Sequence, residues 1–295
     1  MLKIKYYVDS CSDIDEQYAA ENDIGMFAIP VTFEDGSTYL DWVELKSRDF
    51  YRKLAQSRDI PKTSQPSVEQ FAQAMRDSLS DYDAFIYISL SSRGSGAYQT
   101  ALLAKSMVLE EHPEAQIEII DSMGFSLFIV AMLMEAIQLQ KEGKSLSEIV
   151  AGAKRRRCYT DVLVVVDTLK YLEKGGRINK ASLIAGTLLN LKPVLSVRGG
   201  LIEAIDKFKG SKTVIPKMVK KLADMDIDAA DPHFFIVNAD VEDRAQQLWE
   251  AVSQAYPGHD LIMSRPIGAT VGTHIGPGTL AVFFKTNTPQ QLYDD

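Results

Sequence analysis

The sequence is poor in cysteine and in positive charge. Its 295 residues include only Cys11 and Cys158, whose separation matches no metal-binding pattern. We therefore expect free thiols and a reducing, cytoplasmic setting rather than a disulfide framework. Lysine and arginine number 32 against 40 aspartates and glutamates, a net charge of -8. Because nucleic-acid binders usually carry a basic surplus, this charge argues against nucleic acid as a partner.

Long hydrophobic runs are also missing. The longest, residues 125–134, is much shorter than the roughly 20 residues that a membrane-spanning helix needs. Residues 1–15 lack the apolar stretch of a signal peptide. We expect no integral membrane segment and interpret 125–134 as a buried helix. Hydrophobic residues at 46% and charged residues at 24% are typical of a globular protein, and the length suffices for two domains.

The first half alternates apolar strands with helical patterns. Residues 3–8, 84–90 and 115–121 have strand character, and each is followed by a polar turn and a helix. We expect a further strand over 24–33 and a first helix that begins near Asp13. This order predicts an α/β fold with a mainly parallel sheet.

The second half has a different pattern, in which the predicted strands follow one another more closely in sequence and a helical region breaks at Gly175–Gly176. The predicted strands are 161–168, 191–197, 200–208, 232–240 and 279–285, with a helix over 243–256. We place a domain boundary after the basic run 154–157, giving domains 1–157 and 158–295. The fold class is two α/β domains, a mainly parallel sheet in the first and a mixed sheet in the second, with the ligand between them. The basic run itself is typical of a solvated helix C-terminus, with an anion patch as the alternative.

Small polar residues follow three of the predicted strands, where open α/β sheets bind ligands. They are Asp9–Ser10, the segment 91–96 and Asp121–Ser122. Ser95 and Gly96 begin a helix whose free amides favour an anion. Helix capping by a serine explains the same pattern equally well.

Two further stretches carry polar groups in unusual settings. Thr63 lies in an extended segment just before Ser67, which we expect to cap a helix together with Gln70. A plain loop explains this stretch as well.

His274 stands in "VGTHIGPG", a stretch poorly suited to helix or strand. Its ring can donate a hydrogen bond to a carboxylate or phosphate in either protonation state. The glycines would bare the backbone so that a ligand can approach; a purely structural histidine is the alternative. The surroundings of Ser95 do not match a nucleophile elbow, and we find no Walker A loop, dinucleotide motif or metal cluster. The residues alone therefore indicate an anion-binding cleft with no metal and no complete catalytic machinery.

Seven stretches in order resemble the DegV family of bacterial fatty-acid-binding proteins: "VDSCSD", "KTSQPSVEQF", "SSRGSGAYQTA", "IIDS", "LKYLEKGGRI", "LKPVLSV" and "GTHIGPGTLAVFF". The resemblance implies two α/β domains around one long-chain fatty acid, with no other cofactor. It also implies a carrier subunit whose bound carboxylate is phosphorylated by the separate ATP-binding subunit of a fatty acid kinase, for phospholipid metabolism.

The resemblance assigns Thr63, Ser95 and His274 to the ligand carboxylate. Supporting positions are Ser10, Gly96, Ser122 and Gly272. Arg177 matches an arginine linked to the kinase partner. Lys209 stands where the family has a second arginine, and lysine keeps the charge but loses the planar fork. Gly94 and Ala97 replace a leucine and a threonine of the family, so Gly94 is expected to widen the pocket mouth or alter acyl preference.

The leading interpretation is a lipid-binding subunit that is not an enzyme by itself. The apolar segments 125–134 and 182–190 are candidate tunnel walls. One alternative is a stand-alone enzyme that acts on a small carboxylate or phosphate through Ser95, His274 or Asp9. Another is a sensor or regulatory module that binds such an anion in the same interdomain cleft.

Overall fold

The computed structural model describes residues 2–178, 190–231 and 233–290. A parallel four-stranded sheet, in the order β2-β1-β6-β7, organises the first half. Its strands are β1 (Ile4–Asp9), β2 (Gly25–Phe27), β6 (Ala84–Ser89) and β7 (Ile117–Asp121). The helices of this half are α1 (Glu16–Glu21), α2 (Ser47–Gln56), α3 (Val68–Ser78), α4 (Ala97–Glu111), α5 (Leu127–Lys141) and α6 (Leu146–Cys158). The expected parallel sheet is confirmed.

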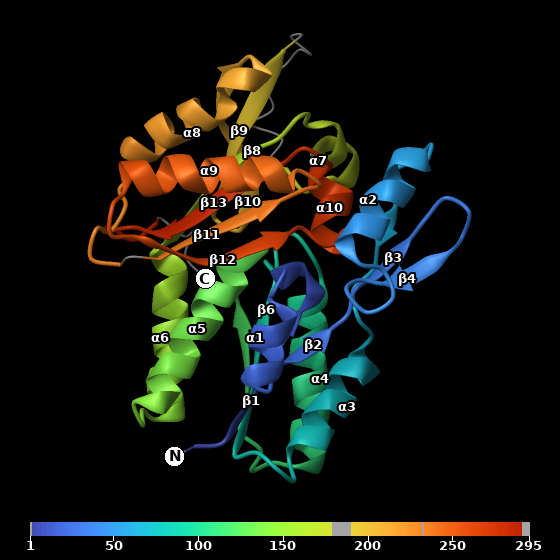
Figure 1. Cartoon of the computed structure of the whole chain (residues 1–295). Helices are drawn as coiled ribbons and strands as arrows, with labels where there is room; N and C mark the ends of the chain where they lie inside the picture. The colour runs from blue at the N-terminus through green and yellow to red at the C-terminus, as the bar shows by residue number, and fades with distance from the viewer. Residues whose placement is uncertain (1, 179–189, 232, 291–295) are drawn as a thin grey trace.

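A mixed six-stranded sheet, in the order β10-β9-β8-β13-β11-β12, organises the second half. Its strands are β8 (Thr160–Val165), β9 (Leu191–Arg198), β10 (Leu201–Lys209), β11 (His233–Asn238), β12 (Asp260–Pro266) and β13 (Leu280–Lys285). Only the β11–β12 pairing is parallel. Helices α8 (Val214–Ala223) and α9 (Glu242–Ala255) cover one face, and the other face turns toward the first sheet (Figure 1). The two-domain α/β fold class is therefore confirmed.

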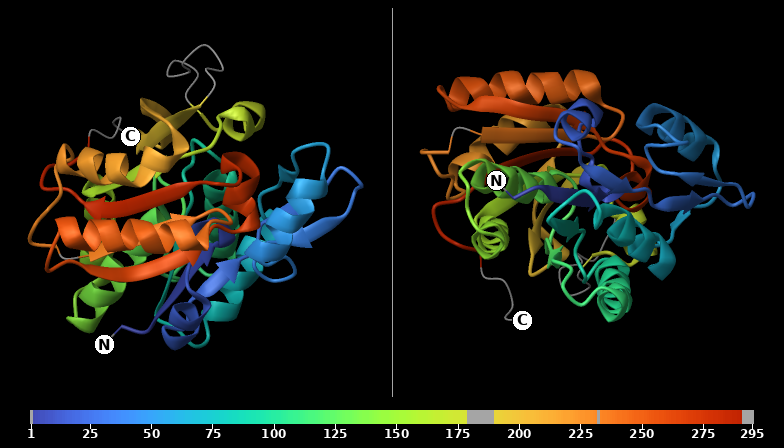
Figure 2. Two further views of the ribbon diagram at one scale, coloured as in Figure 1. Left: turned by 45° about the horizontal axis from the view of Figure 1, so that its top comes forward. Right: turned by 90° about the horizontal axis from the view of Figure 1, so that it is seen from below.

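The strand expected over 24–33 is instead two strands in different sheets. Gly25–Phe27 pairs with β1, whereas β3 (Pro30–Thr32) joins a small antiparallel sheet with β4 (Thr38–Leu40) and β5 (Lys62–Thr63). Pro30 lacks the N–H that a continued ladder needs, and the Ile29 N–H donates to Ser10 Oγ at 3.0 Å. This small sheet and α2 project to one side of both larger sheets (Figures 1 and 2).

The first helix also begins later than the sequence indicates. Asp13 has a left-handed backbone with φ of 51°, and α1 starts at Glu16. Asp15 caps it, because its carboxylate accepts the Tyr18 N–H at 2.9 Å. The carboxylate of Asp13 is thus left free to serve another helix, described below.

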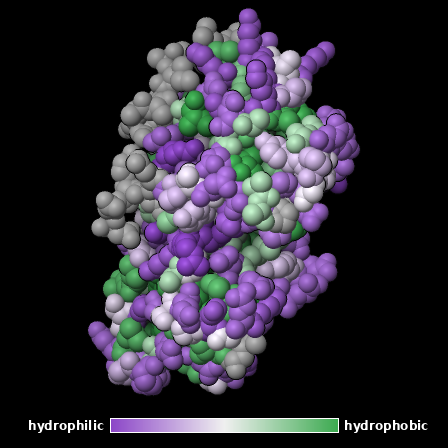
Figure 3. Space-filling model, turned by 90° about the vertical axis from the view of Figure 1, so that its left-hand side faces the viewer, coloured by the Kyte–Doolittle hydropathy of each residue, from purple (hydrophilic) through white to green (hydrophobic). Residues whose placement is uncertain are grey.

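Residues 125–134 lead into α5 and are mostly buried, as expected for a core helix. Among the described residues, no helix combines the length and the apolar composition needed to cross a bilayer. The face that lies on the left in Figure 1 is mostly hydrophilic, with apolar residues in small separate groups (Figure 3).

The basic run 154–157 is more than a solvated helix end. Arg156 is 91% buried and donates to Asp231 at 2.6 Å, which ties α6 to the segment before β11. Arg157 donates to the Asp121 carbonyl at 2.9 Å. Only Lys154 and Arg155 are exposed. The change of sheet falls between β7 and β8, and we keep the domain boundary after residue 157 as a proposal.

Asp231→Ala should lower the free energy of unfolding by about 3–5 kcal/mol, because it leaves the buried Arg156 charge without its carboxylate. Arg155→Ala is the matched control from the same run: Arg155 is exposed and 4.0 Å from Glu135, so its loss should change stability by less than about 0.5 kcal/mol. Urea unfolding followed by circular dichroism measures both. Equal losses in the two variants would contradict a buried tether at Arg156.

Candidate functional site

A cavity of about 350 Å³ lies between the carboxyl end of the first sheet and the inner face of the second. Val162, Val164, Val237 and Phe283 form much of its wall from the second sheet, and Phe125 faces them from the first half. The volume is within the range of about 300–1,000 Å³ that small-molecule sites occupy. The walls are apolar, so the cavity suits a ligand with a hydrocarbon body.

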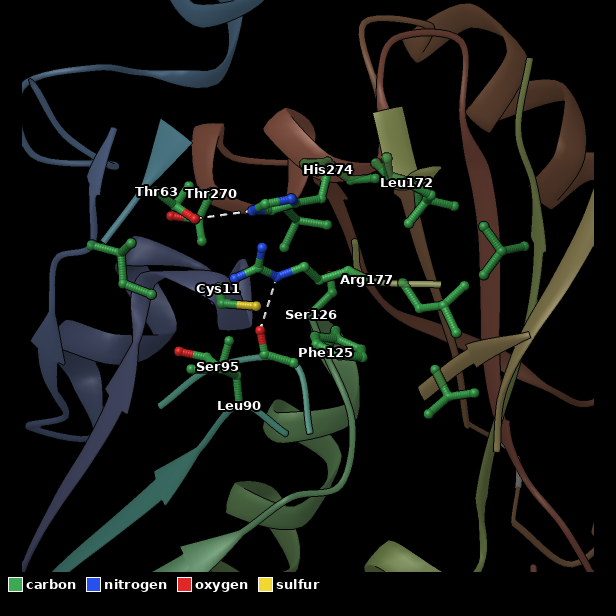
Figure 4. A pocket seen from close by; sticks show the side chains of 18 of the residues that line it. Cys11, Thr63, Leu90, Ser95, Phe125, Ser126, Leu172, Arg177, Thr270 and His274 are labelled. Atoms are coloured by element: carbon green, nitrogen blue, oxygen red, sulfur yellow. Dashed lines mark hydrogen bonds between the residues drawn. The ribbon is translucent and has the colours of Figure 1, made fainter. Parts of the chain in front are cut away.

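Polar groups gather at one end of this cavity. Thr63, at the end of β5, and His274 meet there, with 2.9 Å between Thr63 Oγ1 and His274 Nε2 (Figure 4). The two residues are 211 positions apart in sequence and come from different halves of the chain. Thr63, Ser95 and His274, which the resemblance assigned to a ligand carboxylate, all line this cavity, and their binding of a carboxylate stays a prediction.

His274 lies on a helix, which corrects the expectation for its glycine-rich stretch. Helix α10 (Ala269–Ile275) carries the ring in its last turn and ends at Gly276, whose φ is 78°. The glycines and Pro277 that weaken the helical pattern mostly follow the helix rather than fall within it. They act as its stop signal.

The start of α10 is held by carboxylates of the first half. Asp41 accepts the N–H groups of Ala269 at 2.8 Å and Thr270 at 3.0 Å. Asp13 accepts the Gly268 N–H at 2.7 Å. These bonds satisfy amides that a helix start leaves without intrahelical partners. The position of His274 is thus set by the first half of the chain.

These carboxyl groups are fully buried, which raises the pKa of each. The pKa of Asp13 rises to about 7 and that of Asp41 to about 6, in both cases chiefly because burial penalises the charged form. Burial likewise raises the pKa of Asp9 to about 6; this side chain binds the Cys11 and Leu90 amides and the Tyr87 hydroxyl beneath the cavity.

Burial, and to a smaller extent the nearby Arg177 charge, together lower the pKa of His274 to about 4. The imidazole is therefore neutral at pH 7. Positive charge at this end of the cavity comes from Arg177, whose guanidinium lies between the Thr63–His274 pair and Ser95 (Figure 4).

Arg177 donates to the carbonyls of Gly94, at 3.0 Å, and Gly175. Within the described part of the chain no carboxylate forms an ion pair with it. The sequence suggested only a partner contact for this residue, so its place inside the cavity was missed. A lone arginine directly after the Gly175–Gly176 break was the available signal.

Ser95 precedes Gly96, the N-cap residue of α4, and its role in binding an anion stays a prediction. It lines the cavity, and its Oγ accepts the Ala97 N–H at 3.2 Å at the start of α4. Gly96 also lines the cavity, and a Cβ there would stand 2.2 Å from Gln65 Oε1.

The other supporting positions lie outside the cavity lining that the structure describes. Ser10 lies beneath it, 3.2 Å from the Thr270 hydroxyl. Ser122 is bonded to Gly124 in a turn. Gly272 faces the rings of Phe50 and Tyr51, on the other side of α10.

The glycines near His274 make room for protein side chains, not for a ligand. A Cβ at Gly276 would stand 2.3 Å from the Tyr171 ring, and one at Gly278 would stand 2.5 Å from the Asp167 carboxylate. The expectation that they expose the ring is therefore wrong. Gly94 follows the same rule: a Cβ there would stand 2.6 Å from the Phe125 ring, so this glycine seats Phe125 rather than widening the mouth.

Lys209, expected as a contact for a partner subunit, is exposed at the far end of β10. It lies seven residues beyond the lining residue Ile202, or about 23 Å at a usual strand rise, and its partner role stays a prediction. Of the apolar segment 125–134, only Phe125 and Ser126 line the cavity. The other candidate wall, 182–190, lies outside the described residues except for Asn190.

No group of three potential metal ligands occurs among the described side chains. The arrangement offers hydrogen-bond donors and one cation at the end of an apolar chamber. Its chemistry is that of binding an amphipathic anion.

Comparisons with known proteins agree with this fold. A family model described as an uncharacterised protein of the DegV family matches residues 3–287. A DegV domain-containing protein of Caldanaerobacter subterraneus subsp. tengcongensis is 33% identical over 286 residues, covering 97% of this chain and 99% of the relative. One from Staphylococcus aureus is 30% identical over 284 residues, covering 95% and 96%.

Solved structures are similar over nearly the whole chain. A DegV family protein from Thermus thermophilus, described by its fatty acid binding, has a TM-score of 0.86 and 29% identity and covers 97% of this chain and 100% of its own. DegV of Bacillus subtilis, described as a fatty acid binding protein, has a TM-score of 0.85 and 27% identity with the same coverage.

Asp13→Asn should change how stability depends on pH. The folded-state pKa of Asp13 is about 7 against 3.8 for the free group, so the folded protein holds a proton that the unfolded chain releases between these values. Wild-type stability from this group is therefore lost as pH rises from about 4 to about 7. The asparagine side chain does not titrate, so the variant does not lose stability in this way. As pH rises, its free energy of unfolding should increase relative to that of the wild type, by about 1.4 kcal/mol for each unit by which the pKa of Asp13 is raised. Urea unfolding at pH 4.5 and 7.5 tests this, and a pH-independent difference would refute it.

Proposed function

Because this chain belongs to the DegV family, we propose that it binds one long-chain fatty acid in the cavity between its two sheets. One observation carries the proposal: a single chamber joins apolar walls to a polar end with the cation Arg177, which has no acidic partner in the described ranges 2–178, 190–231 and 233–290. The described relatives that bind fatty acids share the fold over nearly the full length.

The hydrocarbon tail would supply most of the affinity. Each buried methylene is worth about 0.8 kcal/mol, so a long chain gains on the order of 10 kcal/mol before the costs of association. The aliphatic and aromatic side chains of β8, β11 and β13, with Phe125 opposite, offer the surface for this burial.

The carboxylate would sit at the polar end. Thr63, Ser95 and His274 supply hydrogen bonds, and Arg177 supplies the positive charge that the neutral His274 does not. A buried carboxylate without a cation would be costly, which makes Arg177 the chief electrostatic partner.

We further propose that the protein presents this carboxylate to a separate ATP-binding kinase subunit. A carboxylate oxygen would attack the γ-phosphorus of ATP, forming an acyl phosphate and releasing ADP, as a step toward phospholipids. Arg177 and the exposed Lys209 are candidate contacts for that subunit. The setting would be the cytoplasm, where Cys11 and Cys158 remain free thiols.

Freshly purified protein should carry a single long-chain fatty acid per chain in native mass spectrometry. Denaturation and lipid analysis would then identify the acyl chain. Protein that stays empty after incubation with a panel of fatty acids would overturn the lipid proposal and favour a small polar anion.

Arg177→Gln should weaken binding of a fatty acid by about 10- to 100-fold, the usual worth of a hydrogen bond to a charged group. Binding of the fatty alcohol of equal length should change little, since it carries no charge. Titration calorimetry with both ligands separates the two effects, and Arg155→Gln, an exposed arginine far from the cavity, is the control. Equal weakening for acid and alcohol would show that Arg177 acts through packing.

His274→Ala should keep the fatty acid bound but lose acyl phosphate formation with the kinase subunit by about 100-fold or more, the usual cost of removing a donor aimed at developing charge. The tail contacts remain, whereas the head group loses the residue that orients it with Thr63. Bound lipid is measured by mass spectrometry and turnover by ADP release. Unchanged turnover would exclude a role for His274 in the transfer.

A further inference from the structure

Gly175 lies directly against the imidazole of His274. It is the last residue of α7 (Lys170–Gly175), and an ideal Cβ built on it would stand 2.5 Å from His274 Nδ1 and 3.4 Å from Cε1. Real Cβ atoms essentially never approach another heavy atom within 3.0 Å. The next residue, Gly176, is different: its φ of 70° needs glycine-like freedom, but the space around its Cβ position is open. At Gly175, by contrast, the lack of a side chain is what leaves room for the imidazole of His274.

The ring of His274 is therefore fixed from two sides. Thr63 hydrogen-bonds Nε2, and the α7 backbone lies beside Nδ1. Nδ1 is buried and has no hydrogen-bond partner within the part of the chain that the structure describes. Among the described residues, this edge of the ring is therefore bounded by the Gly175 backbone and not by a second hydrogen bond.

The same turn also positions Arg177. The Gly175 carbonyl accepts a hydrogen bond from the Arg177 guanidinium, which reaches on to the Gly94 carbonyl of the first half. His274 and Arg177 are consequently placed by a single backbone segment. Burial, together with the nearby charge of Arg177, holds the pKa of His274 at about 4.

We propose that Gly175 is a positioning residue for the head-group end of the cavity. Its missing side chain lets the α7 turn seat His274 against Thr63 with Arg177 alongside. The consequence for fatty acid presentation rests on the proposed function; the placement of the ring does not.

Gly175→Ala is the test, with Gly176→Asn as the neighbouring control. Asparagine tolerates a left-handed backbone, and no atom lies within 4 Å of the Cβ position at 176. In Gly175→Ala the added methyl group should displace the His274 ring, break its bond to Thr63 and expose it. Gly176→Asn should leave the ring in place.

The first readout is NMR titration of lipid-free protein, with the His274 signal assigned by its loss in His274→Ala. The pKa of His274 should rise from about 4 toward the ordinary 6.5 in Gly175→Ala and stay near 4 in Gly176→Asn. With fatty acid and the kinase subunit, Gly175→Ala should match His274→Ala: lipid retained, turnover lost. A His274 pKa that is the same in wild type and Gly175→Ala would overturn the proposal.

A second measurement uses only the wild-type protein, so it tests the proposal even if the Gly175→Ala variant does not fold. In wild-type protein, the Gly175 Hα protons should show a nuclear Overhauser contact to the His274 ring and a ring-current shift. Lack of both would also overturn the proposal. Neither NMR measurement involves lipid. Protein that stays empty in mass spectrometry would therefore refute the proposed function, whereas the NMR results would still test whether Gly175 positions the His274 ring.

Discussion

The capping of α10 by buried carboxylates is the constraint on which the rest of the site depends. Asp13 and Asp41 accept the first amides of this helix across 255 and 228 to 229 residues of sequence. An uncapped helix start in this buried position would leave several N–H groups without partners. The carboxylates thereby fix how the second half sits on the first, and with it the distance between His274 and Thr63. The cavity and its polar end both result from this packing of the second half of the chain against the first.

The site divides its tasks between charge and apolar surface. Burial makes His274 neutral, so it works as a hydrogen-bonding group, while the positive charge of Arg177 is paired with no carboxylate among the described residues. An apolar chamber alone would accept any hydrocarbon, and a cation alone would accept any small anion. In the proposed function, their junction at one end would select molecules that have both parts and would orient them with the head toward Thr63.

Local features of the fold could be predicted from the sequence, whereas contacts between residues far apart in the chain could not. β1, β6 and β7 were visible because apolar runs end in small polar residues, and the Ser67 cap with Gln70 was found as expected. The division of segment 24–33 into two strands at Pro30 was not predicted. It depends on the hydrogen bond from the Ile29 N–H to Ser10 Oγ, a contact that no local sequence pattern shows. The roles of Asp13 and Arg177 depend on partners far along the chain. Thr63 and His274 were named through family resemblance, since neither stretch alone separates a ligand site from a loop.

The glycines around the site have a consequence for how such a chain can change over evolutionary time. Gly94 with Phe125 and Gly175 with His274 are complementary pairs, in which one residue lacks a side chain and the other fills the space that this leaves. A mutation that enlarges the empty member is harmful until its partner shrinks. The two positions of each pair are thus free to drift only together, and the shape of the cavity is inherited as a set of coupled choices rather than as single residues.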